Sequence, residues 1–273
     1  MKKAIMIMGT ASGVGKSTVV LTLCRLLKER GYKVAPFKAQ NITSRVHVLP
    51  DKKMMANSSK QAALACGMVP HIDMAPVLLK PSKSGGVDLF LHGERIEEKD
   101  FYKMRDRLFN EAFAAYKRLL ANYDVVVIEG AGSPVELNLM DQDIVNLHFA
   151  KRAKVPAILV SDIHRGGVYA SIYGTLALMS PEERALFQGV IVNKFMGDPV
   201  TFGDGSKIME DVTELPVLGV LPHVAVDLED EDGLTVKEKV LDIDEELAIS
   251  QLAAEMEKHL DVAAILEIME KGV

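Results

Sequence analysis

The sequence predicts an α/β protein built on a doubly wound, mostly parallel sheet. Six short apolar runs recur along its 273 residues and alternate with stretches of helical periodicity. The runs lack the period-two polarity of half-exposed strands, so they indicate strands buried on both faces and joined by helical crossovers. The runs are KAIMIM (3–8), YKVAPF (32–37), DVVVIE (124–129), VPAILVSD (155–162), GVIVNK (189–194) and LPVLGV (215–220).

The helical stretches are equally clear at three places. Residues 16–30 and 101–119 carry apolar side chains at helical spacing, and a helical tail is expected over about 245–270, packed on the flank of the sheet. Between about 40 and 99 the pattern is less regular and contains four prolines, which predicts an irregular insertion beside the sheet. Because no repeat or linker interrupts the chain, we expect a single domain over 1–273.

Composition excludes several classes of function. The formal net charge is −6, which disfavours nucleic acid as a partner. No run approaches the roughly 18 consecutive apolar residues of a membrane span, so no membrane partner is expected. Cys24 and Cys66 both lie in apolar stretches, which favours free thiols and a cytoplasmic location. We also expect a homodimer, the commonest oligomer of soluble proteins.

The strongest motif is GTASGVGKST, residues 9–18, between the first predicted strand and the first predicted helix. Successive N–H groups of such a loop point at phosphate oxygens, and its glycines allow close approach. The lysine supplies a positive charge and the serine a ligand for Mg²⁺. The motif therefore predicts a P-loop NTPase. The nucleotide-binding residues expected from it are Thr10, Gly13, Val14, Gly15, Lys16, Ser17 and Thr18.

Three further candidates end later strands, at the sheet edge where ligands bind in this architecture. Glu129 is a second Mg²⁺ ligand or a carboxylate that caps a loop. Asn193 reads the nucleotide base or stabilises a turn. The pattern NKxD, which reads guanine, has an Asp in its fourth position. This chain has Met196 there, so ATP is favoured over GTP. Asp162 contacts metal-bound water or substrate, or caps the helix that follows.

Eight blocks of unusual sequence follow one another between about residues 4 and 225. They are GTASGVGKST (9–18), PFKAQN (36–41), DMAPVLLKP (73–81), EGAGSPVELNL (129–139), DIVN (143–146), VSDIHRGGVYAS (160–171), YGTLAL (173–178) and NKFMGDP (193–199). In this order they resemble the synthetase half of the cobyric acid synthases. Five residues separate Gly9 from Gly15, an extended spacing typical of dethiobiotin synthetase and its relatives.

The resemblance implies a dethiobiotin-synthetase-like fold, ATP and Mg²⁺, and amidation of corrinoid carboxylates in cobalamin synthesis. A carboxylate needs activation before ammonia can attack it, so we expect an acyl phosphate formed from ATP. The catalytic residues would be Lys16, Lys38 and Asp162, although Lys38 can also be read as a solvated lysine. The residues expected to contact the substrate are Gln40, Asn41, Lys80 and Ser133, of which Lys80 can also be read as a solvated lysine.

The sequence also departs from the family pattern. Residues 42–63 and 84–92 differ where substrate contacts are expected. Family members continue into a glutaminase domain with a nucleophilic cysteine, and neither Cys24 nor Cys66 fits that role, so ammonia is expected from solution or from a separate glutaminase subunit. The alternatives are amidation of another tetrapyrrole, a dethiobiotin-type ligase, and a partition-type ATPase switch. Such switches carry a second lysine where this chain has Ala11.

Overall fold

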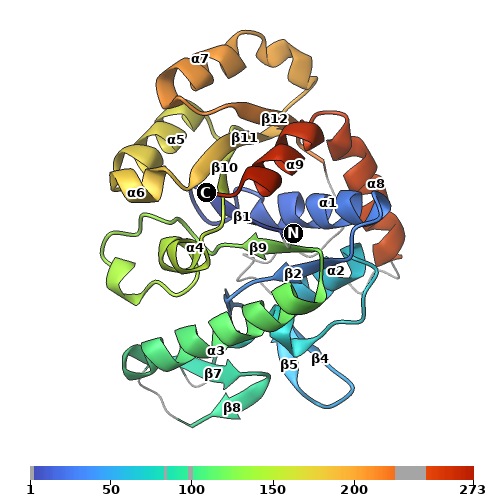
Figure 1. Cartoon of the computed structure of the whole chain (residues 1–273), viewed down its shortest axis with the longest axis vertical. Helices are drawn as coiled ribbons and strands as arrows, with labels where there is room; N and C mark the ends of the chain where they lie inside the picture. Colours follow the sequence, from blue (N-terminus) through green and yellow to red (C-terminus); the bar gives the residue numbers. More distant parts are fainter. Residues whose placement is uncertain (1–2, 83–84, 98–100, 225–243) are drawn as a thin grey trace.

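A computed structural model describes residues 3–82, 85–97, 101–224 and 244–273. Its main sheet has six strands in the order β12-β11-β10-β1-β9-β2, and every neighbouring pair is parallel (Figure 1). All six lie at the predicted apolar runs, which confirms the doubly wound parallel sheet. The strands are β1 (Lys3–Gly9), β2 (Val34–Phe37), β9 (Val125–Glu129), β10 (Ala157–Asp162), β11 (Phe187–Phe195) and β12 (Val217–Pro222).

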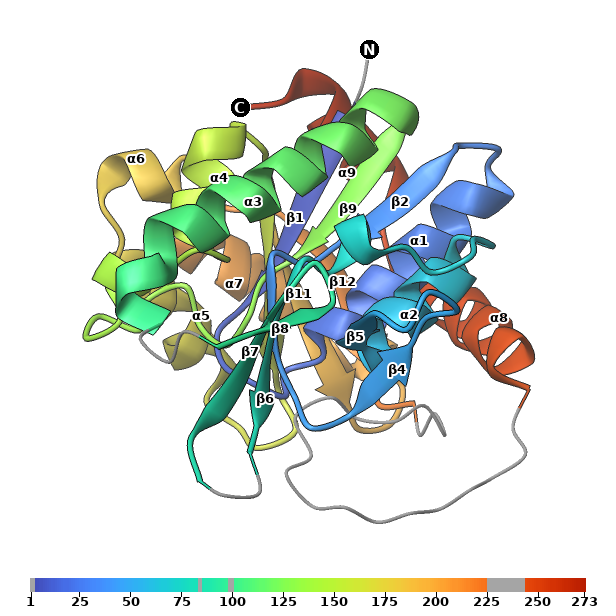
Figure 2. The ribbon, with the colours of Figure 1, turned by 90° about the horizontal axis from the view of Figure 1, so that it is seen from below.

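Helices cover both faces of this sheet (Figure 2). Alternate side chains of β1 show the division: Ile5 and Ile7 belong to one buried cluster, and Met6 and Met8 to the other. On the Ile5 face lie α1 (Lys16–Glu29), α8 (Glu245–Glu257) and α9 (Val262–Lys271). On the Met6 face lie α3 (Phe101–Asn122), α4 (Leu147–Ala153), α5 (Val168–Ala177) and α7 (Gly205–Thr213). The short elements are α6 (Pro181–Arg184), η2 (Met140–Gln142) and η3 (Pro199–Phe202).

The insertion after β2 is more regular than the sequence predicted. It forms a four-stranded sheet in the order β3-β6-β7-β8, a two-stranded sheet of β4 and β5, and the helix α2. Its strands have only three to five residues, too few for a clear periodic pattern, and its prolines lie between strands or at a strand end. The elements are β3 (Gln40–Ile42), β4 (Val46–Val48), β5 (Met54–Ala56), α2 (Asn57–Ala65), η1 (Ile72–Met74), β6 (Val77–Pro81), β7 (Val87–Leu91) and β8 (Glu94–Ile96).

The helical tail is confirmed, but it is two helices instead of one. Asp261 separates them: its N–H donates to the Leu218 carbonyl over 2.8 Å, and its Oδ1 accepts the N–H of Ala264 over 2.9 Å, which caps α9. The bond to Leu218 ties this break to β12. None of the helices in the described parts of the chain combines the length and the apolar composition that crossing a membrane requires.

Candidate functional site

The phosphate loop lies between β1 and α1, as predicted. Gly15 is the N-cap of α1 and has φ of 95°, a left-handed conformation that favours glycine. A Cβ at this position would also collide with the side-chain amide of Asn193. The first N–H groups of α1 have no acceptor within the helix, so this end of α1 can receive phosphate oxygens.

Lys16 bridges the phosphate loop and the loop that follows β9. Its ammonium donates to the carbonyl of Ala11 over 2.9 Å and to that of Gly132 over 3.1 Å. The residue is only 6% exposed. The charge predicted for phosphate binding is therefore held at the loop, on backbone carbonyls of two different segments.

Ser17, Lys38 and Glu129 come together from three parts of the chain. Oε1 of Glu129, at the end of β9, accepts from the Ser17 hydroxyl over 2.8 Å and from the Lys38 ammonium over 2.9 Å. The Lys38 and Glu129 side chains are 9% and 7% exposed, so this is a buried ion pair. The hydroxyl and the carboxylate are hard oxygen groups, which fit Mg²⁺.

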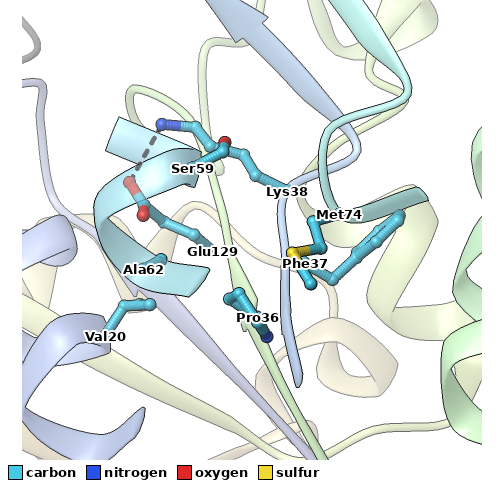
Figure 3. A pocket seen from close by; sticks show the side chains of 8 residues that line it. All are labelled: Val20, Pro36, Phe37, Lys38, Ser59, Ala62, Met74 and Glu129. Atoms are coloured by element: carbon cyan, nitrogen blue, oxygen red, sulfur yellow. Dashed lines mark hydrogen bonds and ion pairs between the residues drawn. The ribbon is translucent and has the colours of Figure 1, made fainter. Parts of the chain in front are cut away.

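A cavity of about 10 Å³ adjoins this ion pair, enough for about one water molecule (Figure 3). Ser59 of α2 lies in its wall beside Lys38 and Glu129, and the other lining side chains are apolar. The Ser59 hydroxyl is buried and has no hydrogen-bond partner among the described residues. The insertion therefore contributes a wall to the predicted site.

The ends of β10 and β11 hold the phosphate loop from the other side. The Asn193 amide donates to the Val14 carbonyl over 2.9 Å, and the Lys194 ammonium donates to the Gly13 carbonyl. Lys194 also lies 3.4 Å from Oδ2 of Asp162. Lys194 was not among the predicted site residues, although it stands next to Asn193 in the same motif. Oδ1 of Asn193 is buried and unpaired within the described structure.

Asp162 does not cap the helix that follows. Its Oδ1 accepts the N–H of His164 over 2.7 Å, and the N-cap of α5 is Gly167. At the neighbouring strand end, the Thr10 and Ser161 hydroxyls lie 2.9 Å apart. The helix-cap interpretation of Asp162 is therefore wrong, and this side chain stands between a turn and Lys194.

The four predicted substrate residues lie in three places. Gln40 and Asn41 are buried in β3; Oε1 of Gln40 and both amide atoms of Asn41 lack partners in the described structure. Lys80 lies in β6, with its Cα in register with that of Asp88. Ser133 is 8% exposed in the loop after β9. Ser133 follows Gly132, whose carbonyl accepts the Lys16 ammonium. No hydrogen bond or ion pair joins Lys80 to Ser17, Lys38 or Glu129 among the described residues.

Cys24 and Cys66 are both buried free thiols, as the sequence predicted. Burial, followed by the nearby Cys66 thiol, raises the pKa of Cys24 well above its ordinary value. A thiol that ionises so reluctantly is a poor nucleophile.

Residues 5–236 match the family described as the CobQ/CobB/MinD/ParA nucleotide binding domain. The chain belongs to this family. A domain of this family binds nucleotides, which agrees with the loop between β1 and α1. Thr18, in the first turn of α1, completes the motif of this loop.

Curated relatives of this nucleotide-binding domain include cobyric acid synthases. The enzyme of Klebsiella pneumoniae is 45% identical over 240 residues, which cover 87% of this chain and 47% of the relative. The cobyric acid synthase of Citrobacter koseri is 46% identical over the same shares. The chain thus spans about half the length of these relatives, and the resemblance to their family is confirmed.

Two solved structures are similar at low identity. FtsY from Elizabethkingia anophelis in complex with GDP is 18% identical, with a TM-score of 0.49, over 92% of this chain and 63% of that chain. MinD from Aquifex aeolicus is 16% identical, with a TM-score of 0.46, over 94% and 97% of the two chains.

Proposed function

We propose that this chain is an ATP- and Mg²⁺-dependent synthetase that amidates carboxylate side chains of a corrinoid, as in cobyric acid synthesis. One observation carries the proposal: Ser17, Lys38 and Glu129 meet beside the phosphate loop. The 45% identity to a cobyric acid synthase over 240 residues supports the choice of substrate class.

The reaction proceeds in two steps. A carboxylate oxygen attacks the γ-phosphorus of ATP while the bond to the β,γ-bridging oxygen breaks, which gives an acyl phosphate and ADP. Ammonia then attacks the acyl carbon, phosphate leaves with the electron pair of the C–O bond, and the extra proton of the nitrogen passes to solvent. Lys16 and Lys38 neutralise charge on the transferred phosphoryl group.

Ser17 and Glu129 would hold Mg²⁺, and the ion supplies positive charge beside the phosphates when bound. The Lys38 ammonium shares the same oxygen of Glu129, which keeps the carboxylate oriented toward the loop. Asp162, within reach of Lys194, holds water or substrate at the end of β10.

Adenine is the base we assign to Asn193. The buried, unpaired Oδ1 of this side chain requires a donor, and the exocyclic amino group of adenine supplies one. Guanine carries a carbonyl oxygen at the corresponding ring position, which cannot donate. Because an unsatisfied buried acceptor is costly, this contact favours ATP.

The insertion would contact the corrinoid. Gln40 and Asn41 offer unsatisfied amide groups that suit the carboxylates and amides of such a substrate. Lys80 would attract its negative charge, and Ser133 would contact it from the loop after β9. We further propose ammonia from solution or a separate glutaminase subunit, a homodimer, and a cytoplasmic location.

Incubation of the purified protein with MgATP, ammonium and a panel of corrinoid and sirohydrochlorin carboxylates tests this proposal. Mass spectrometry should detect replacement of hydroxyl by amino groups in the corrinoid alone, with one ADP formed for each amide. Lys16→Ala should abolish amide formation while the circular dichroism spectrum is unchanged. A parallel reaction with glutamine instead of ammonium shows whether a glutaminase subunit is required.

Two results would overturn the assignment. Amidation of sirohydrochlorin carboxylates alone would move the substrate to another tetrapyrrole. ATP hydrolysis that is indifferent to every carboxylate would instead favour a nucleotide-driven switch.

A further inference from the structure

Asn146, the N-cap of α4, holds the loop that follows β9. Its Oδ1 accepts the N–H of Ala131 over 3.1 Å, and its Nδ2 donates to the carbonyls of Ala131 over 2.7 Å and of Ser133 over 3.4 Å. Asn146 is only 6% exposed. A Cβ at Gly130 would collide with Oδ1 of Asn146, so the approach of this side chain requires glycine there.

Asp143 in turn fixes Asn146. Oδ1 of Asp143 accepts the N–H groups of Val145 over 2.9 Å and of Asn146 over 2.8 Å, and its Oδ2 accepts that of His148 over 3.1 Å. The backbone that presents the Asn146 amide is therefore tied by three N–H groups to one carboxylate, so the amide has little freedom to turn away from the loop.

Gly132, in the middle of this loop, contacts Lys16. Asn146 binds the backbone on both sides of Gly132, at Ala131 and at Ser133, and the carbonyl of Gly132 accepts the Lys16 ammonium over 3.1 Å. The direction of that carbonyl thus depends on the Asn146 amide. No catalytic or nucleotide contact of Asn146 itself is needed for this effect.

We infer that Asn146 is a positioning residue that acts through the Gly132 carbonyl to place the Lys16 ammonium for a triphosphate. The inference rests on the proposed nucleotide site. A lysine that is already in place when the nucleotide arrives does not lose side-chain freedom at that moment, so binding is tighter. The same loop carries Ser133, so nucleotide binding and the substrate side of the site share one hydrogen-bonded support.

Asn146→Asp tests this inference, because it keeps the size and one acceptor oxygen but loses the NH₂ donor. We expect MgATP to bind about 10- to 100-fold more weakly, the range for replacing a residue that orients a metal ligand through a hydrogen bond. Asn122→Asp is the matched control: it also loses a donor to a backbone carbonyl, that of Arg118, but lies exposed on α3. Its affinity should equal that of the wild type.

A double-mutant cycle with Lys16→Ala separates positioning from a structural role, with affinities measured by competition against a fluorescent ATP analogue. If Asn146 acts through Lys16, Asn146→Asp has little further effect once Lys16 is gone. An equal loss of affinity in both backgrounds would mean that Asn146 only stabilises the fold, and would overturn the inference. Asn146→Ser, whose shorter side chain cannot reach both Ala131 and Ser133, serves if the aspartate variant does not fold, and the same loss of affinity is expected from it.

The outcomes also separate this inference from the proposed function. A wild-type protein that does not bind MgATP would refute the nucleotide site itself. Tight binding by the wild type, matched by Asn146→Asp and Asn146→Ser, would refute only the role of Asn146.

Discussion

Gly15 combines two separate requirements at a single residue. Its φ of 95° is unfavourable for any other L-amino acid, and its missing side chain leaves room for the amide of Asn193. The first requirement is local and the second depends on β11, a distant part of the chain. Comparison with a second glycine can separate the two contributions.

Gly15→Ala should abolish MgATP binding and lower the free energy of unfolding by about 1–3 kcal/mol, the range for a strained backbone conformation. Gly31→Ala is the control, because Gly31 has φ of 85° and nothing within 4 Å of the added Cβ. It should lose stability but bind MgATP as the wild type does. Urea denaturation and calorimetric titration measure the two effects; equal nucleotide binding by both variants would contradict the role given to the Asn193 contact.

The residues of the phosphate loop could be predicted from sequence because their order along the chain determines their arrangement. Lys38 and Glu129 could be proposed from their positions at strand ends, but the oxygen that they share with Ser17 depends on the order of strands in the sheet. Asn146 was not predicted, although it ends the block DIVN (143–146), because its role arises from contacts with a loop 13 to 15 residues earlier. Isolated turn residues carry no periodic signal.

At the scale of elements, an ion pair between Arg118 and Asp73 connects α3 to the insertion. Arg118 donates to Oδ1 of Asp73 in η1 over 2.5 Å and to its Oδ2 over 2.9 Å. Burial alone would raise the pKa of Asp73, but the Arg118 hydrogen bonds and charge outweigh it and hold that pKa below its ordinary value of 3.8. The ionised form of Asp73 therefore stabilises the fold.

The stabilisation from this pair should be fully present above the ordinary pKa of Asp73, which the unfolded chain has, and disappear as the pH falls through the lower folded pKa. Arg118→Gln removes the charge. Its unfolding temperature should lie below that of the wild type at pH 7, and the gap should narrow as the pH approaches 3. Scanning calorimetry across this range measures the gap; one that is constant with pH would show that Asp73 does not carry the effect.

Element prediction succeeded for strands buried on both faces and for the long helices α1 and α3, whereas no residue ranges were predicted for the shorter α2, α5 and α7. β1, β9 and β10 are almost continuously apolar because neighbours cover them on every side. The strands of the insertion have no such signature, since three residues such as those of β3 cannot display an alternating pattern. The break in the tail escaped notice because apolar spacing continues through it.

At the scale of the whole molecule, the tail helices α8 and α9 pack against one of the two buried apolar clusters. α8 lies along α1, and its side chains Ile249, Leu252 and Met256 are buried in the cluster that contains Ile5 and Ile7. Its first turn is also anchored by charge, because Glu245 pairs with Lys60 of α2 and Glu246 lies 3.6 Å from the buried Arg25 of α1. We therefore expect the tail to unfold together with the sheet.

Ile249→Ala should lower the free energy of unfolding by about 2–5 kcal/mol, the usual cost of removing a large side chain from a packed core. Leu247→Ala, on the same helix but 55% exposed, should change it by no more than about 0.5 kcal/mol. Urea denaturation followed by circular dichroism measures both, and a single transition is expected in each case. Equal losses in the two variants would show that α8 is not packed as described.

The place of β2 at the edge of the main sheet has an evolutionary consequence. The insertion branches off after that last strand, so it can be lengthened, shortened or rewritten without breaking any bond between the interior strands β1 and β10, which flank the phosphate loop. Within 42–63 the helix α2 is the exception, because its Ser59 and Ala62 line the cavity beside Lys38 and Glu129. Changes in length elsewhere in this segment should therefore leave the contacts between the main sheet and the phosphate loop in place.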